Sequence, residues 1–219
     1  HTASLIHDDL PCMDNDVLRR GLPTNHVIFG ESLALLAGDA LLAWAFSYPS
    51  SLLVQAGVSA ERIVRATEIF AQAVGPWGIC GGQVLDSDPL SIREGDDFLW
   101  DIARGKTATL IQGALLSGAI LGGAGPEIEE RTAEYGLHLG LAFQIVDDIL
   151  DATAPVEELG KTPGKDAAQG KRTFVTHFGL DRSRDFAQRE SDAARRALEG
   201  IPRGEWLRSL ASYLVHRCS

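Results

Sequence analysis

The sequence predicts an all-α fold, a bundle of helices that forms one domain over residues 1–219. Apolar residues recur with the period of an amphipathic helix over long stretches. No stretch alternates between apolar and polar residues as a half-buried strand does. Glycine and proline fall between the helical stretches, where chain reversals connect the helices of a bundle. Hydrophobic residues make up 45% of the chain, which is enough for one sizeable core.

The helical period predicts the elements in chain order. They are residues Glu31–Tyr48, Glu61–Asp86, Asp96–Leu121, Pro126–Ala152, Ser183–Ile201 and a short segment from Glu205. Breaks fall at Pro49, Gly75-Pro76 and Gly122-Gly123, and a long polar loop runs from Ala154 to Gly179. Loops of that length without regular structure are uncommon and often functional.

One uncharged stretch, Thr107–Gly125, has two interpretations. Its length suits a membrane span. Gln112, Ser117 and several Gly and Thr residues lower its hydrophobicity, so we expect a buried helix of a soluble bundle.

Charge and cysteine content exclude several classes of protein. The formal net charge of −10 excludes nonspecific nucleic-acid binding, because no excess of Lys and Arg displaces phosphate counterions. An anionic substrate would therefore need metal ions. Cys12, Cys80 and Cys218 form no CxxC motif, and their odd number predicts neither a disulfide framework nor a zinc site. We expect a cytoplasmic protein without a leader at His1, although targeting to an organelle stays open if the chain starts upstream.

The first candidate site is the run HDDLPCMDNDVLRRG over residues 7–21. It places Asp8, Asp9, Asp14 and Asp16 within nine residues, and two arginines follow. Clustered carboxylates repel one another unless cations bridge them, and oxygen ligands suit Mg²⁺. A solvated acidic turn is an equally good interpretation of this run alone, because Asp also favours caps and turns.

The second candidate site is FQIVDDILD over residues 143–151. Asp147 and Asp151 are one helical turn apart, with Asp148 beside them. Aliphatic neighbours surround these acids, which favours a site over a solvated face. Two such clusters on different helices predict opposed carboxylate walls in a bundle cavity.

Other chemistries fit these residues less well. A di-iron bundle needs Glu-x-x-His pairs, and Glu134 with His138 is one residue too long. A P-loop is excluded because the spacing from Gly164 to Lys171 is wrong and Arg172 replaces its Ser or Thr.

Together the two motifs resemble those of the polyprenyl synthetase family, the short-chain trans-isoprenyl diphosphate synthases. HDDLPCMDNDVLRRGLPTNHVIFGE is similar to the family's first aspartate-rich motif, and FQIVDDILD followed by GKTPGKDAAQGKRTF is similar to the second. The resemblance covers essentially the whole chain. It implies an isoprenoid synthase-type helical bundle around a central cavity, without the N-terminal helices that carry a Gly-Lys-Arg type motif in relatives.

The resemblance also implies roles for particular residues. The implied magnesium ligands are Asp8, Asp9, Asp14, Asp147, Asp148 and Asp151, with three ions expected. The implied diphosphate and active-site contacts are Arg19, Arg20, Gln83, Lys106, Thr107, Phe143, Gln144, Lys161 and Lys171. Among these, Arg19, Lys106 and Lys161 are the expected catalytic residues. Gln83 and Thr107 read equally well as satisfied core polar residues, and Phe143 as ordinary packing.

The implied activity is a prenyl transfer. Magnesium ions and lysines would stabilise the diphosphate that leaves an allylic substrate, and isopentenyl diphosphate would attack the resulting cation. We expect a homodimer without a membrane span. The alternatives are a class I terpene cyclase, whose second metal motif usually differs from DDILD, and a non-catalytic subunit of a heteromeric synthase.

Product length depends on the residues one turn before Asp8. Ala3 and Ser4 are small, and in resembling farnesyl synthases an aromatic residue commonly fills the position of Ala3. We therefore expect geranylgeranyl rather than farnesyl diphosphate as the product. Phe46 or Trp44 could close the cavity instead.

Overall fold

The computed structural model describes residues 1–87, 95–153 and 172–216. The described chain forms two compact units, one over His1–Ser59 and one that begins at Ala60. Helices make up nearly all of the regular structure in both units, so the all-α prediction is confirmed. That the units form a single domain stays a prediction.

The first unit begins with α1 (Thr2–Asp8) and a short hairpin of β1 (Leu18–Arg19) and β2 (Leu22–Pro23). Leu18 pairs with Pro23 and Arg19 with Leu22. The turn residues Arg20 and Gly21 both have positive φ, as a two-residue hairpin loop of the primed type requires. The expectation that no strand forms was therefore wrong, because two-residue strands are too short to produce an alternating pattern.

Two helices complete this unit, α2 (Asn25–Phe29) and α3 (Glu31–Gln55). The prediction that Pro49 ends the helix at Tyr48 was wrong, because α3 continues through the proline. Pro49 has no N–H for the helix ladder, and beside this gap the Ser50 hydroxyl donates to the carbonyl oxygen of Phe46 at 2.8 Å. Packing also holds α3: its Ala34 is buried with Ile6 and Leu10 in a small core, against which Leu41 packs.

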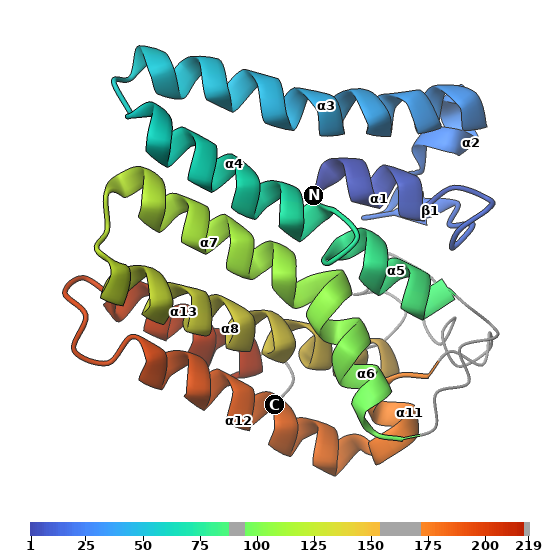
Figure 1. The fold of residues 1–219 in the computed structure, drawn as a ribbon. Coiled ribbons are helices and arrows are strands. Elements are labelled where there is room, and N and C mark those ends of the chain that lie inside the picture. The colour runs from blue at the N-terminus through green and yellow to red at the C-terminus, as the bar shows by residue number, and fades with distance from the viewer. Residues whose placement is uncertain (88–94, 154–171, 217–219) are drawn as a thin grey trace. The chain divides into compact units, whose positions relative to one another are not determined.

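The second unit starts with α4 (Ala60–Val74) and α5 (Ile79–Ser87), so the segment predicted over Glu61–Asp86 is two helices separated at Gly75-Pro76. Next, α6 (Asp97–Ile102), the π-helix η1 (Ala103–Ala108) and α7 (Thr109–Gly122) follow one another without a break (Figure 1). α7 packs on α4 through small residues. A Cβ at Gly113 would lie 2.8 Å from the Cβ of Ala73, and Ser117 donates to the carbonyl of Ala66 at 3.2 Å.

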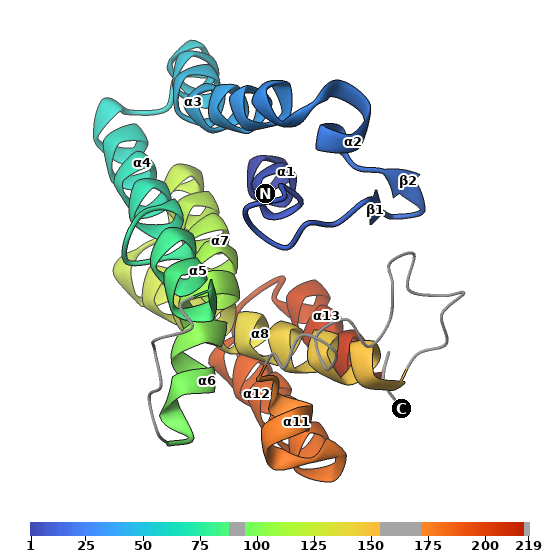
Figure 2. The same cartoon turned by 90° about the vertical axis from the view of Figure 1, so that its right-hand side faces the viewer.

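α8 (Pro126–Thr153) is the central helix of this unit. It contacts η1, α7, α11 (Phe174–Phe178), α12 (Leu180–Ala197) and α13 (Glu205–His216), and Figure 2 shows it beside α12 and α13. Tyr135, Ile145 and Ile149 of α8 are fully buried and lie in the main core with Phe174. The Tyr135 hydroxyl donates to the carbonyl of Leu207 at 2.7 Å, and burial raises the pKa of Tyr135 to about 12.

Two smaller expectations also differ from the structure. The polar loop predicted over Ala154–Gly179 contains α11, whose first turn is closed by a capping box between Thr173 and Thr176. Residues 154–171 of that loop lie outside the described residues. The helix predicted over Ser183–Ile201 begins earlier, at Leu180, and ends at Ala197.

None of the described helices combines the length and apolar character that crossing a membrane requires. The stretch Thr107–Gly125 instead forms the end of η1 and all of α7. Half-buried residues dominate α7, and Gly113 and Ile120 are buried.

Candidate active site

The first aspartate cluster lies where α1 ends. Asp8 is the last residue of the helix and Asp9 is its C-cap. The chain then folds back, so that the backbone N–H of Asp14 donates to the carbonyl of Asp8 at 2.9 Å. Asn15 allows this reversal with a positive φ of 50°. The local fold therefore brings the backbone of Asp14 next to that of Asp8, and that both are ligands of one site stays a prediction.

Arg19 is paired with this cluster. Its Nε lies 2.8 and 2.9 Å from the carboxylate oxygens of Asp9, its Nη2 lies 2.7 Å from Oδ1, and Asp9 is only 4% exposed. The hydrogen bond to Asp9 raises the pKa of Arg19, and burial opposes this. Arg20 occupies the hairpin turn and is exposed. The two predicted diphosphate arginines thus differ: one is held by a predicted metal ligand and the other faces solvent.

His7 attaches α1 to α3. Its Nε2 lies 3.0 Å from the carbonyl oxygen of Leu35 and 3.5 Å from the carboxylate of Asp39. The ring occupies the space above Gly38, where an added Cβ would lie 2.1 Å from Nε2. Because His7 directly precedes Asp8 and Asp9, this contact fixes the start of the first cluster. Sequence reasoning did not single out His7 or Gly38.

The second aspartate cluster lies on one face of α8. Gln144, Asp147, Asp148 and Asp151 follow the i, i+3, i+4, i+7 spacing of a helix face and are partly exposed. Ile145, Val146 and Ile149 on another face are at most 1% exposed. The acids and the apolar residues of this part of α8 therefore lie on separate faces of the helix.

A chain of hydrogen bonds orients Asp148. The Thr107 hydroxyl donates to Oε1 of Gln144 at 2.5 Å, and Nε2 of Gln144 donates to Oδ1 of Asp148 at 2.9 Å. The backbone N–H of Phe174 donates to Oδ2 of Asp148 at 2.8 Å. Both oxygens of this carboxylate therefore accept hydrogen bonds. The arrangement links three predicted site residues from η1 and α8.

Close backbone approach makes this chain of bonds possible. A Cβ at Gly140 on α8 would lie 2.4 Å from the Cα of Ala108, and one at Gly136 would lie 2.7 Å from the Cα of Gln112. These glycines precede Gln144 on the same helix face at intervals of four residues. The small residues let η1 and α7 approach α8 closely enough for Thr107 to reach Gln144.

Lys106, which precedes Thr107, contacts a residue that sequence reasoning missed. Its Nζ lies 2.5 Å from Oδ2 of Asp86 on α5. Lys106 lies in η1, and π-helices occur frequently at functional sites. Asp86 follows Gln83 by three residues, a spacing that places both on one face of α5 and could have identified it.

The other residues predicted for the site make fewer contacts that bear on its chemistry, or lie outside the described residues. Nε2 of Gln83 donates to the Ser87 hydroxyl at 3.1 Å, while its buried Oε1 has no hydrogen-bond partner among the described residues. Phe143 is 41% exposed, which argues against ordinary core packing within its unit. Ala3 and Ser4 are half-buried on α1, and their effect on chain length stays a prediction. Lys161 and Lys171 lie outside the described residues.

The donor atoms of both clusters suit magnesium, because they are carboxylate oxygens. Across residues 1–87, 95–153 and 172–216, no three His, Cys, Asp or Glu side chains are grouped so that they could hold a metal ion. Asp9 and Asp148 instead accept hydrogen bonds from Arg19, Gln144 and Phe174. Metal binding at these two aspartates would therefore exchange protein donors for the ion.

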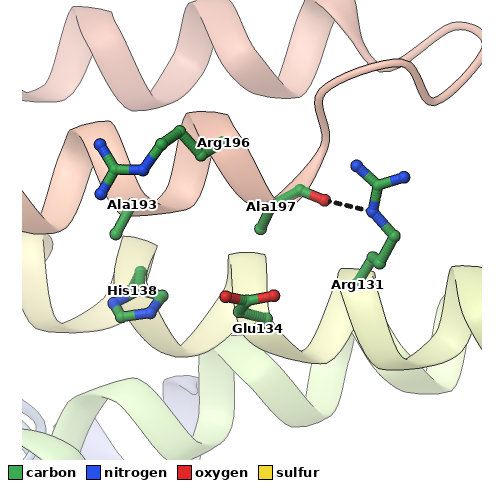
Figure 3. A pocket seen from close by; sticks show the side chains of 6 residues that line it. All are labelled: Arg131, Glu134, His138, Ala193, Arg196 and Ala197. Atoms are coloured by element: carbon green, nitrogen blue, oxygen red, sulfur yellow. Dashed lines mark hydrogen bonds between the residues drawn. The ribbon is translucent and has the colours of Figure 1, made fainter.

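A groove of about 390 Å³ between α8 and α12 holds a different set of side chains. Figure 3 shows Glu134, His138 and Arg131 of α8 facing Arg196, Ala193 and Ala197 of α12. Nδ1 of His138 lies 2.6 Å from Oε2 of Glu190, and this hydrogen bond raises the pKa of His138. Arg131 donates from Nε to the carbonyl of Ala197 at 2.7 Å. This groove contains none of the residues predicted for the active site.

Residues 1–199 match the family model of the polyprenyl synthetases. The chain belongs to the polyprenyl synthetase family. It is 46% identical to the heterodimeric geranylgeranyl pyrophosphate synthase large subunit 1 of Arabidopsis thaliana, over 99% of this chain and 60% of that protein. It is 44% identical to a dimethylallyltranstransferase of Fischerella ambigua, over 99% of this chain and 63% of that protein. The chain thus spans about 60% of the length of these curated relatives.

Solved structures of family members share the fold. The geranyltransferase of Helicobacter pylori, crystallised with magnesium and isoprenyl diphosphate, superposes with a TM-score of 0.83 at 36% identity, over 99% of this chain and 70% of that one. The FPP/GFPP synthase of Zymomonas mobilis superposes with a TM-score of 0.81 at 35% identity, over 98% and 72%. The fold that the family resemblance implied is confirmed.

Proposed function

We propose that this chain carries the aspartate motifs of a magnesium-dependent trans-prenyltransferase. The enzyme joins isopentenyl diphosphate to an allylic diphosphate and makes geranylgeranyl diphosphate. The observation that carries the proposal is the set of contacts around η1: Lys106 and Thr107 lie in one π-turn, and Thr107 orients Asp148 of the second cluster through Gln144. A lysine ammonium and an oriented carboxylate, carried by consecutive residues of η1 and by α8, are groups that suit a magnesium diphosphate.

The residues divide the work by charge. Asp8, Asp9 and Asp14 in the first unit, and Asp147, Asp148 and Asp151 in the second, are the proposed ligands of three magnesium ions. Magnesium held by these carboxylates would neutralise the diphosphate and lower the barrier to its departure. Lys106 donates to the departing phosphate oxygens, and Arg19 and Arg20 bind diphosphate from the first unit. Phe143 faces the reacting carbons.

The apolar side chains of the bundle keep water from the allylic cation. The double bond of isopentenyl diphosphate then attacks the cation, and the released diphosphate takes the proton that is lost. Orientation supplies much of the rate, because two bound substrates react as if they were one molecule. Gln83 and Gln144 contribute to this orientation through their amide groups.

The product is proposed from two supports. Ala3 and Ser4 are small and lie in α1 one turn before Asp8, which leaves room for a long prenyl tail. Several relatives of this chain are named geranylgeranyl pyrophosphate synthases. We also propose a cytoplasmic homodimer. A heteromeric enzyme is the second candidate, because one relative is the large subunit of a heterodimer.

The test measures turnover of the full-length protein with labelled isopentenyl diphosphate and farnesyl diphosphate. We expect geranylgeranyl diphosphate to form with Mg²⁺ and its formation to stop when EDTA is added. Asp8→Ala and Asp147→Ala should each lower kcat by about a thousandfold, because each removes a ligand used at bond breaking.

The matched control is Asp185→Ala, which removes an exposed aspartate of α12 and should retain activity. Circular dichroism checks that each variant keeps its helices. Normal turnover in both motif variants would overturn the metal assignment. Formation of a cyclic hydrocarbon from an allylic diphosphate alone would indicate a terpene cyclase instead.

A further inference from the structure

We propose that Asp86 is a positioning residue of this active site, which holds the ammonium group of Lys106 in the place where it meets the substrate diphosphate. The proposal rests on the proposed function and adds a residue to it. Asp86 has no assigned part in the reaction so far. Its part follows from three observations on α5, η1 and α8.

The first observation is the ion pair itself. Nζ of Lys106 lies 2.5 Å from Oδ2 of Asp86, and the side chains are 22% and 9% exposed. A lysine carries its charge on a flexible stem with many rotamers, so its position is defined only where a partner fixes it. A mostly buried carboxylate fixes it more strongly than a surface partner does, because water screens the pair less.

The second observation is the contact between the two backbones that carry the pair. A Cβ at Gly82 would lie 2.1 Å from the backbone nitrogen of Lys106, and one at Gly105 would lie 2.9 Å from the Cα of Gly82. α5 and η1 therefore touch without intervening side chains. Asp86 follows Gly82 by one helical turn, so the same contact that fixes the backbone of Lys106 also places its partner.

The third observation links this pair to the metal-binding cluster. The ammonium of Lys106 donates to Asp86 on α5. Its neighbour Thr107 is connected to Asp148 on α8 by hydrogen bonds through Gln144. Consecutive residues of one π-turn are thus tied to carboxylates on two different helices. The ion pair with Asp86 and the hydrogen bonds from Thr107 to Asp148 together set the position of the ammonium. Loss of Asp86 leaves only the hydrogen bonds of Thr107.

Loss of Asp86 should change turnover more than binding. Without its partner, Lys106 samples several rotamers and donates poorly to the leaving oxygens, and small misplacements of this kind lower rates about ten- to a hundredfold. Diphosphate binding is subject to two opposing effects. The disordered lysine weakens it, but removal of a nearby negative charge strengthens it.

The experiment uses the full-length enzyme with Asp86→Asn, which keeps the shape and one acceptor oxygen, alone and combined with Lys106→Met. The matched control is Glu129→Gln, which removes the charge of another ion pair of this unit, in which Glu129 Oε2 lies 2.6 Å from Nη2 of Arg65. The measurements are kcat, KM for both substrates, the dissociation constant of magnesium diphosphate by calorimetry, and thermal unfolding.

For Asp86→Asn we expect kcat to fall about ten- to a hundredfold, with the dissociation constant within about threefold of the wild type. In the Lys106→Met background the same change should alter kcat by less than about threefold, because a residue that acts through Lys106 has nothing left to position. Glu129→Gln should keep wild-type turnover, whatever its effect on unfolding.

Three results would overturn the proposal. Wild-type kcat in Asp86→Asn would show that the ion pair is dispensable. Equal losses with and without Lys106 would show that Asp86 acts by another route, including a purely structural one. An inactive wild-type enzyme would overturn the proposed function and this inference together, whereas the first two results leave the proposed function intact.

Discussion

Nε and Nη2 of Arg19 lie 2.7 to 2.9 Å from the carboxylate oxygens of Asp9, in the segment that follows α1. Two predicted site residues, one a magnesium ligand and the other a diphosphate contact, therefore hold each other. Binding of both ligands must break or share this contact. The pair is consequently a structural element of the first unit as well as part of the proposed site.

Arg19→Ala should destabilise the protein by about 2 to 3 kcal/mol, because it leaves the nearly buried carboxylate of Asp9 without its charged donor. Urea denaturation measures this difference. Arg20→Ala is the control, since Arg20 is exposed in the hairpin turn and its loss should change stability by less than about 0.5 kcal/mol. Equal stability of the two variants would contradict a structural part for the Arg19 contact.

Gly38→Ala should destabilise the first unit by about 1 to 3 kcal/mol. The new methyl group would lie 2.1 Å from Nε2 of His7 and force the ring away from the carbonyl of Leu35. His7→Ala removes the clash, so the double variant should be more stable than the sum of the two single losses implies. Thermal unfolding of all three variants measures the coupling, and strict additivity would exclude direct contact between these residues.

The pair of His138 and Glu190 should make stability depend on pH. The hydrogen bond from Glu190 raises the pKa of His138, and Glu134 adds to this while burial and Arg196 oppose it. A raised pKa gives stability that is complete below the unfolded pKa of histidine, about 6.5, and is lost as pH rises through the folded pKa. His138 and Glu190 also line a second groove, distinct from the one in Figure 3. Its other charged residues are Asp97, Asp101 and Arg104, which lie near this pair.

Glu190→Gln should therefore cost about 1 kcal/mol at pH 5.5 and much less at pH 9. Urea denaturation at both pH values measures the difference. Asp192→Asn is the matched control, because it changes a more exposed acid of the same helix, which pairs with Arg195 three residues away. A cost for Glu190→Gln that is the same at both pH values would contradict a charged His138.

Ala3→Tyr should shorten the product. Ala3 lies on α1 one turn before Asp8, and under the proposed function an aromatic ring there should fill part of the space for the prenyl tail. We expect the full-length wild type to release mainly geranylgeraniol after dephosphorylation, and the variant mainly farnesol. Chromatography separates the two alcohols. Unchanged products would place the floor of the cavity at other residues, with Phe46 and Trp44 as the next candidates.

Sequence could predict the parts of the fold that depend on local pattern. α8 was predicted almost to its ends, because its buried face and its acidic face both repeat with the helical period. The hairpin was missed because Leu18–Arg19 and Leu22–Pro23 are too short to carry a period. The predicted helix at Glu31–Tyr48 was too short, because the rule that proline ends a helix does not hold at Pro49, which lies inside α3.

Sequence could predict those residues of the candidate site that lie close together in one segment of the chain. Both aspartate clusters stand out because several acids gather within a few residues. Asp86 does not, because it is a single acid whose significance arises from Lys106, twenty residues later. His7 is similar, since its partner Gly38 is distant in sequence and has no side chain to reveal the contact.

The contact between Gly82 and Gly105 limits which residues of this chain can be substituted. Neither position can accept a side chain without a shift of the backbone. In a combinatorial library that randomises α5 and η1, most variants would therefore misfold. Substitutions are better sought at exposed positions of the same helices, such as Val84 of α5. Directed evolution should therefore keep both glycines fixed and draw its diversity from such neighbours.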